Sequence, residues 1–267
     1  MKGQTISTKF YKKADIAQSD FRTKKSLGQN FIFDMGFLNS VVDKLCIAPT
    51  DVVVEIGTGK GTLTKCLATR AKHVITYEID PRLAEYLRAE FAPIPNIELR
   101  LGDFMTSGDT AGGIVCESMY RVIANIPYYI TTPIIMKLLA DPHCTEICVL
   151  VQEEVARRIV ATHGTPEYGA LSVTCQLCAE CRILKTVGRA LFHPRPNVDS
   201  AFVILKKQGE NAPKGFEVFI KNIFSKRRKK ISNSVDRALL EKCGVDANLR
   251  PEQLSPLQFR QIYDTMG

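Results

Sequence analysis

The chain has 267 residues, of which 45% are hydrophobic and 24% are charged, the balance of an ordinary globular protein with a sizeable core. Its formal net charge of +8 favours a polyanionic partner, because each phosphate that a cation neutralises releases condensed counterions. Residues 1–25 contain no apolar run, and no stretch is long and apolar enough to span a membrane, so we expect neither a secretory signal nor a membrane span.

Short apolar runs alternate with segments of helical pattern along most of the chain, after a polar, basic stretch at residues 1–24 that we interpret as a flexible arm. The strands that we expect span residues 52–56, 73–79, 97–101, 121–124, 146–151, 183–187 and 201–205. Helices are expected after the first strand to about Arg70, from Pro81 to Phe91, and at 133–140 and 153–161. This alternation predicts an α/β fold with a doubly wound, mostly parallel, Rossmann-like sheet of seven strands.

The last quarter of the chain has a different pattern. Residues 207–215 are polar with Gly and Pro, which indicates a linker. Residues 216–267 then have a helical pattern throughout. We therefore expect an α/β domain at residues 25–206 and a small helical domain at 216–267, which is short enough to need support from the first.

The nine cysteines are odd in number and have no spacing typical of a secreted disulfide framework, so we expect a reducing, cytoplasmic compartment. Cys175, Cys178 and Cys181 stand at a spacing that could hold a metal ion. Their apolar flanks, however, are typical of the buried side of a helix, and no fourth ligand follows at a familiar spacing. We expect no metal site here, and cysteines that pack as small hydrophobic side chains.

A glycine-rich loop follows the first expected strand and leads into a helix. Gly57 and Gly59 there permit a tight turn and a close approach of the backbone to a ligand. Glu78 ends the next strand, where a carboxylate can accept hydrogen bonds from both ribose hydroxyls of an adenosyl group. Asp103, after the third strand, could accept a hydrogen bond from an adenine amino group. The G-x-G-x-G spacing differs from the G-x-G-x-x-G dinucleotide fingerprint, so it favours S-adenosylmethionine over a nicotinamide cofactor.

The tetrapeptide Asn125-Ile126-Pro127-Tyr128 follows the fourth strand, at the edge where open α/β sheets bind ligands. An exocyclic adenine amine is a poor nucleophile because its lone pair is delocalised into the ring. The Asn125 side-chain oxygen and the carbonyl of Ile126 or Pro127 could accept its two hydrogens and localise that lone pair. Pro127 stiffens the turn, and the Tyr128 ring offers a stacking face for an extruded base. This pattern predicts methyl transfer to adenine by positioning and electrostatics.

From about Lys24 onwards the chain resembles the KsgA-type ribosomal RNA adenine dimethyltransferase family. The motifs that carry the resemblance are residues 25–31, 55–64, 125–133, 192–201 and 224–230. Thr58 stands where this family usually has proline, and Ile32 where it has leucine.

The resemblance implies N6,N6-dimethylation of two adjacent adenosines in a hairpin near the 3′ end of small-subunit rRNA, within an immature ribosomal subunit, by a monomeric class I methyltransferase. It implies that Asn125, Pro127, Tyr128 and Phe192 are catalytic, with Phe192 as a second aromatic face for the flipped base. It implies that S-adenosylmethionine is bound by Gln29, Asn30, Ile32, Gly57, Gly59, Glu78, Asp103 and Asn125.

Five consecutive cations, from Lys226 to Lys230, could follow an RNA backbone together with Lys221. Such a run is more often a solvated helix face, but an RNA substrate favours contact, so we expect RNA binding by Lys221, Lys226, Arg227, Arg228, Lys229 and Lys230.

Four other functions stay open at this point. They are a large-subunit rRNA methylase of the antibiotic-resistance type, a non-catalytic ribosome-assembly or transcription factor, a nicotinamide oxidoreductase and a DNA adenine methyltransferase. The run 224–230 favours the small-subunit enzyme over the first. Intact Glu78, Asn125 and Tyr128 disfavour a non-catalytic factor, and the glycine spacing disfavours a nicotinamide oxidoreductase. The small helical tail disfavours the fourth, since DNA enzymes normally carry a larger recognition region.

Overall fold

The structure is a computed structural model that describes residues 29–106, 116–209 and 211–267. The expected basic arm at residues 1–24, and the first residues of the motif at 25–31, lie outside the described residues.

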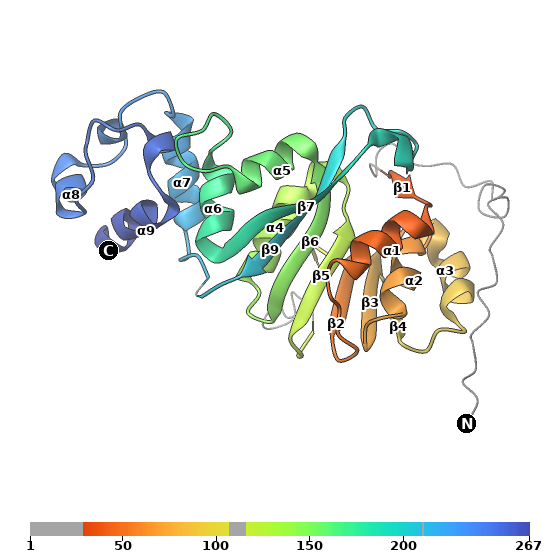
Figure 1. Ribbon diagram of the computed structural model, residues 1–267. Coiled ribbons are helices and arrows are strands. Elements are labelled where there is room, and N and C mark those ends of the chain that lie inside the picture. Colours follow the sequence, from red (N-terminus) through yellow and green to blue (C-terminus); the bar gives the residue numbers. More distant parts are fainter. Residues whose placement is uncertain (1–28, 107–115, 210) are drawn as a thin grey trace.

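A seven-stranded sheet forms the centre of the molecule, with strand order β4-β3-β2-β5-β6-β9-β7 (Figure 1). The strands are β2 (Val52–Ile56), β3 (His73–Glu78), β4 (Ile97–Leu101), β5 (Tyr120–Asn125), β6 (Cys144–Gln152), β7 (Ala179–Val187) and β9 (Ser200–Lys207). Only β9 runs antiparallel to its neighbours β6 and β7. The expected mostly parallel, doubly wound sheet of seven strands is therefore confirmed.

The central strands are mostly apolar because both faces of the sheet are covered. Successive side chains point to opposite faces, so Val54 and Ile56 enter one hydrophobic cluster while Val53 enters the other. Helices α4 (Thr131–Ala140), α5 (Glu153–Val160) and α6 (Ala170–Cys178) pack in the first cluster. Helices α1 (Met35–Asp43) and α2 (Thr62–Ala68) pack in the second, and α3 (Ala84–Phe91) covers β4. The sheet thus lies between two helical layers.

Two very short strands were not expected from the sequence. β1 (Phe31–Ile32) pairs with β8 (Phe192–His193) in an antiparallel ladder that joins the beginning of the described chain to the Pro-rich loop. Short 3₁₀ turns complete this part of the fold: η2 (Pro81–Leu83), η3 (Tyr128–Ile130) and η4 (Arg189–Leu191).

The C-terminal segment consists of α7 (Phe216–Ser225), α8 (Arg237–Lys242) and α9 (Pro256–Thr265), with 3₁₀ turns η5 (Ile231–Asn233) and η6 (Pro251–Gln253). Its hydrophobic core also contains Tyr168 and Val173, which belong to α6 and the loop before it. The Tyr168 hydroxyl donates to the Leu254 carbonyl at 2.9 Å. These helices therefore complete their core against α6, beside which they lie in Figure 1.

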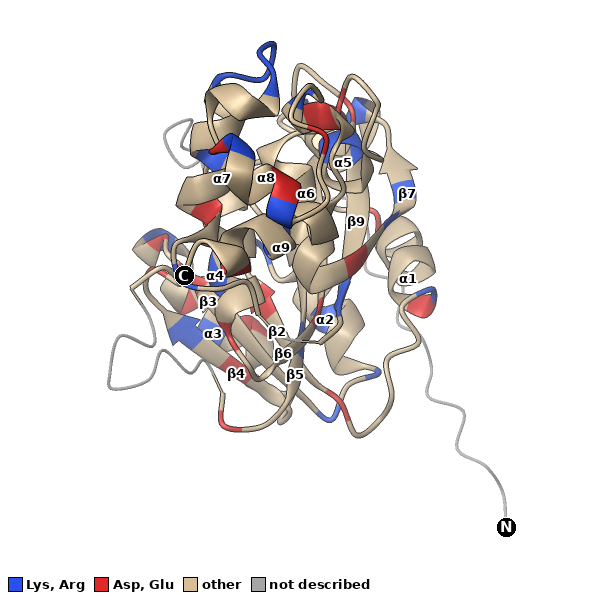
Figure 2. Cartoon of the chain, turned by 90° about the vertical axis from the view of Figure 1, so that its left-hand side faces the viewer, with Lys and Arg blue, Asp and Glu red and all other residues tan. Residues whose placement is uncertain are grey.

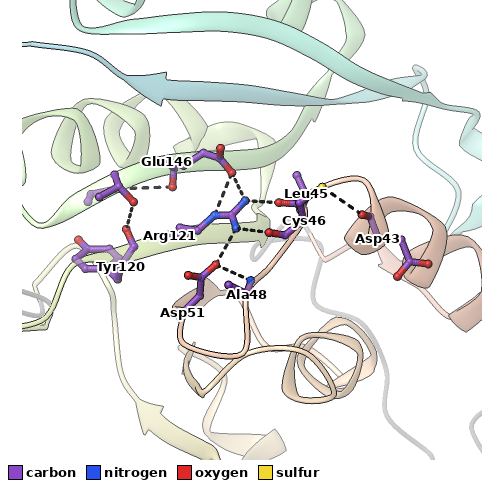
Figure 3. A network of polar contacts seen from close by, with 10 residues as sticks. Asp43, Leu45, Cys46, Ala48, Asp51, Tyr120, Arg121 and Glu146 are labelled. Carbon is purple, nitrogen blue, oxygen red and sulfur yellow. Dashed lines mark hydrogen bonds and ion pairs between the residues drawn. The ribbon is translucent and has the colours of Figure 1, made fainter.

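A polar network ties together the edge of the sheet where the strands begin (Figure 3). The Arg121 guanidinium, whose side chain is 16% exposed, bonds Asp51 at 2.9 Å and Glu146 at 2.5 Å. It also donates to the Leu45 carbonyl at 2.6 Å. The two carboxylates raise the pKa of Arg121 in spite of its burial. One side chain thereby holds β5, β6 and the loop before β2 in register.

The cysteine triplet does not lie on one helix. Cys175 and Cys178 are on α6, whereas Cys181 is on β7, because the helix ends at Cys178. Burial raises the pKa of all three thiols. Across the described residues, no group of three or more His, Cys, Asp or Glu is arranged to hold a metal ion. Nor does any helix of the described chain have the length and apolar character needed to cross a bilayer.

Candidate active site

A pocket opens at the carboxyl ends of β2, β3 and β5, beneath β1. Parallel strands end at one edge of a sheet, so residues far apart in the sequence meet there. Ten of the residues that the sequence singled out line this pocket: Gln29, Asn30, Ile32, Gly57, Gly59, Glu78, Asp103, Asn125, Pro127 and Tyr128. The site is therefore built from five separate stretches of chain.

The glycine loop has a backbone that needs glycine at two pocket positions. Gly57 and Gly59 have φ values of +84° and +57°, a conformation that side chains disfavour. A Cβ on Gly59 would stand 2.7 Å from the Phe31 ring, so only glycine lets this ring close over the loop. The unexpected Thr58 donates or accepts a 2.7 Å hydrogen bond with the Thr76 hydroxyl, which ties the loop to β3.

A second acid, Glu55, lies under the loop and was not singled out from the sequence. Its carboxyl accepts hydrogen bonds from Thr64 at 2.5 Å and Thr76 at 2.8 Å. Burial raises the pKa of Glu55 to about 8, in spite of these two hydroxyls. At neutral pH the folded protein therefore keeps this carboxyl mostly protonated, as a neutral support for the glycine loop.

Glu78 is 4% exposed, and both of its carboxylate oxygens accept backbone N–H groups. Oε2 accepts from Gly59 at 2.7 Å and Oε1 from Asp80 at 2.8 Å. Burial raises the pKa of Glu78, while these backbone donors counteract the rise. The two bonds fix the carboxylate between the loop and the end of β3, with further lone pairs available to a ligand in the pocket.

The N-terminal wall is held by Asp80. The Gln29 side-chain amide donates to Asp80 Oδ2 at 3.1 Å, and Arg82 bonds the same carboxylate at 2.5 Å. Hydrogen bonds from Arg82, above all, hold the pKa of Asp80 at about 2. Gln29 thus anchors the chain before β1, in addition to lining the pocket.

Asn125 ends β5 and has a fixed amide. Its Nδ2 donates to the Asn30 carbonyl at 2.9 Å, so the side-chain oxygen is the group that can meet a ligand. In the following turn the Pro127 carbonyl already accepts from Ile130 N at 3.2 Å and Thr131 Oγ1 at 3.3 Å. No donor among the described residues reaches the Ile126 carbonyl, so this carbonyl, unlike that of Pro127, can still accept a hydrogen bond from a ligand.

Tyr128 and Phe192 lie in different environments. The Tyr128 hydroxyl bonds Ser200 Oγ on β9 at 2.7 Å, which fixes its ring at the pocket wall, and burial raises its pKa. Phe192, in contrast, is 4% exposed and packs with Ile32 and Leu38 in the second hydrophobic cluster. The expected second aromatic face is therefore not at the pocket in this structure, because pairing of β8 with β1 turns Phe192 into the core.

Several pocket residues were not expected from the sequence, among them Ile79, Phe104 and Tyr129. Ile79, which directly follows Glu78, is 48% exposed and gives the pocket an apolar wall. Phe104, beside Asp103, packs edge-on against Tyr77 with ring centroids 5.2 Å apart. Tyr129 lies at the mouth. For Ile79 and Phe104 the available signal was an apolar residue directly after an acid of the predicted site. Asp103 Oδ1 itself accepts from Met105 N at 2.8 Å, which orients the carboxylate.

The basic run is a turn and not a helix face. α7 ends at Ser225, so Lys226–Lys230 form the loop that follows, which Figure 2 shows in blue beyond α7. Arg227 is engaged within the protein: it pairs with Glu252 at 2.7 Å and donates to the Pro166 carbonyl at 2.5 Å. Arg228 and Lys229 are exposed, and within the described chain no carboxylate pairs with them.

The three other cations of the expected RNA-binding set also have protein partners. Lys230 donates to Asn248 Oδ1 at 2.8 Å, and Lys226 donates to the Asn233 carbonyl at 3.4 Å. Lys221 pairs with Glu217 at 2.5 Å, one turn earlier on α7. All three side chains are largely exposed, so these contacts are of the weak surface kind.

Comparison with known proteins identifies relatives over nearly the whole chain. A family model described as "Ribosomal RNA adenine dimethylase" matches residues 20–266. "Ribosomal RNA small subunit methyltransferase A" of Thermotoga petrophila is 40% identical over 244 residues, 91% of each chain. Among solved structures, "23S rRNA methyltransferase ErmE" is 29% identical with a TM-score of 0.70 over 88% of this chain and 98% of its own. A dimethyladenosine transferase from Plasmodium falciparum has a TM-score of 0.74 at 24% identity, covering 87% and 95%.

Proposed function

Because this chain belongs to the ribosomal RNA adenine dimethylase family, we propose that it dimethylates the N6 nitrogen of adenines in small-subunit rRNA. The sheet and its structural neighbours agree with the Rossmann-like class I methyltransferase fold that the sequence predicted. The enzyme is an rRNA adenine dimethyltransferase. Its substrate within that RNA is, in our proposal, a hairpin near the 3′ end with two adjacent adenosines.

The relatives favour the small subunit over the large one. The relative from Thermotoga petrophila, whose name specifies the small subunit, is 40% identical, whereas the 23S rRNA enzyme is 29% identical. A non-catalytic assembly factor is disfavoured by the site itself, where Glu78 and Asn125 have the fixed geometry that methyl transfer needs.

The residues present fit S-adenosylmethionine. Glu78 supplies a buried carboxylate, held by two backbone N–H groups, that can accept from both ribose hydroxyls. Asp103 would accept from the adenine amino group, with Ile79 as the apolar wall against the ring. Gly57 and Gly59 let the backbone approach the rest of the ligand. When bound, the cofactor supplies a methyl group already activated on a sulfonium, so the protein need not activate it.

The fixed amide of Asn125 carries the proposed mechanism. Its side-chain oxygen and the Ile126 carbonyl accept the two hydrogens of the adenine amine, which draws the nitrogen toward tetrahedral geometry and localises its lone pair. The Tyr128 ring, held by Ser200, stacks against the base. No strong general base is needed, because the amine becomes cationic and then loses its proton readily. The protein acts by positioning and electrostatics.

In this proposal, the loop after α7 contacts the RNA outside the pocket. Arg228 and Lys229 are exposed in this loop, which lies at the same end of the molecule as α5 (Figures 1 and 2). We further propose a monomer that acts on an immature ribosomal subunit in the cytoplasm, a compartment that suits nine free thiols.

Incubation with methyl-labelled S-adenosylmethionine and immature small subunits tests this function. The expected product is N6,N6-dimethyladenosine at two adjacent positions near the 3′ end of small-subunit rRNA, mapped by digestion and mass spectrometry. Large subunits in a parallel reaction are the control. Label that enters large-subunit rRNA, or no rRNA at all, would overturn the proposal.

A further inference from the structure

Tyr129 is the most exposed residue of the turn that follows Asn125. Its side chain is 62% exposed, although it lines the same pocket as Tyr128. A large aromatic ring held in water loses the free energy that burial would give it. Nothing in the methyl-transfer mechanism described above uses this ring.

The local backbone explains why it points outward. Tyr128, Tyr129 and Ile130 form a 3₁₀ turn that the bond from Ile130 N to the Pro127 carbonyl closes at 3.2 Å. With three residues per turn, consecutive side chains point about 120° apart. Tyr128 points to Ser200, and Ile130 packs against the first hydrophobic cluster. The third direction, which Tyr129 takes, faces solvent at the pocket mouth.

Base flipping leaves a neighbouring base that can stack on this ring. When an adenine leaves its strand and enters the pocket, the adjacent base loses a stacking partner. Single-stranded RNA is commonly bound by stacking such bases on exposed aromatic rings. Tyr128 and Tyr129 are successive residues, as the two bases are successive nucleotides. One ring is positioned inside the pocket and the other at its mouth.

We propose that Tyr129 is the stacking site for the nucleotide adjacent to the flipped adenine. This inference rests on the proposed function and extends it. In the proposed substrate, with two adjacent target adenosines, the base on Tyr129 is the second target while the first one reacts. The pocket and its mouth together would then hold both adenines in one binding event.

A thermodynamic cycle between protein and RNA tests the site. The probes are a synthetic hairpin with two adjacent adenosines in its loop and the same hairpin with one of the two made abasic. Binding to wild type, Tyr129→Ala and Tyr129→Phe is measured with S-adenosylhomocysteine present. Tyr129→Ala should weaken binding of the intact hairpin about tenfold, the effect of one lost stacking contact, and Tyr129→Phe should restore it. With the abasic hairpin, Tyr129→Ala and wild type should bind equally.

Three results would overturn the inference: no loss with Tyr129→Ala, an equal loss with both hairpins, or a loss of S-adenosylhomocysteine affinity that assigns the ring to the cofactor. Immature small subunits give a second readout, in which Tyr129→Ala should raise KM about tenfold and change kcat little. If wild type methylates small-subunit rRNA but these differences are absent, only the role of Tyr129 fails. If wild type methylates no rRNA, the proposed function itself fails.

Discussion

Replacing Gly59 with alanine should weaken both the fold and cofactor binding. Gly59 has φ = +57°, and a Cβ there would stand 2.7 Å from a ring carbon of Phe31. Gly164 offers a matched control, because it has φ = +86° and no atom within 4 Å of an added Cβ. The two substitutions share backbone strain, but only the first meets a neighbour.

The magnitudes follow from this difference. A left-handed backbone costs an alanine about 1–2 kcal/mol at either position. At Gly59 the Phe31 ring must also recede by about 0.7 Å to restore a 3.4 Å contact, and such overpacking adds about 1–2 kcal/mol. Because Phe31 lines the pocket, the displaced ring should lower cofactor affinity about tenfold, equivalent to about 1.4 kcal/mol.

Urea denaturation and calorimetric titration with S-adenosylhomocysteine measure the two effects separately. Gly164→Ala should lower the free energy of unfolding by about 1–2 kcal/mol and leave the affinity unchanged. Gly59→Ala should lower both. If Gly59→Ala binds as tightly as Gly164→Ala, the close contact between the glycine loop and Phe31 does not shape the site.

Three other predictions concern the support of the site and its RNA contacts. The pKa of Glu55 is raised to about 8, so the folded protein keeps a proton that the unfolded chain releases above about pH 4.5. Stability should therefore fall as the pH rises between these values, and urea titrations of Glu55→Gln should show a flatter dependence. Neutralising Arg228 and Lys229 together should reduce the slope of log affinity against log salt by about 1.4–1.8, whereas Arg227→Ala should mainly lower stability, because Arg227 pairs with a carboxylate. An unchanged slope in the double variant would remove this loop from the RNA interface. Arg121→Met should lower the free energy of unfolding by about 2–3 kcal/mol, since it leaves two carboxylates unpaired, and an unchanged urea midpoint would contradict the role of its network.

Local patterns in the sequence were sufficient to predict the seven strands of the sheet. In runs such as Val52–Ile56, every residue except Glu55 is apolar because two helical layers cover the strand, and that pattern is visible in the sequence. β1 and β8 are two residues long and exist only because they pair with each other. No local pattern encodes such a pair, and the burial of Phe192 depends on it. The burial of Phe192 could therefore not be predicted from the sequence, and its role as a second aromatic face stays a prediction.

The charge pattern of the sequence likewise does not reveal which cations are paired within the folded protein. The run at 226–230 is plain in the sequence, but the partner of Arg227 is Glu252, which folding brings to it from 25 residues away. A helical pattern was expected throughout residues 216–267, which include these cations, yet α7 ends at Ser225. Most of the predicted site residues lie at or just after the carboxyl end of a strand, and the topology brings these strand ends together at one edge of the sheet.

Single-turnover methyl transfer by Asn125→Ala on immature small subunits tests the proposed mechanism most directly. Loss of the side-chain oxygen should slow transfer at least about 100-fold, as removal of one transition-state hydrogen bond does. The affinity for RNA should remain within about threefold of wild type. Transfer at the wild-type rate would contradict the claim that Asn125 and the Ile126 carbonyl direct the adenine amine to the methyl group.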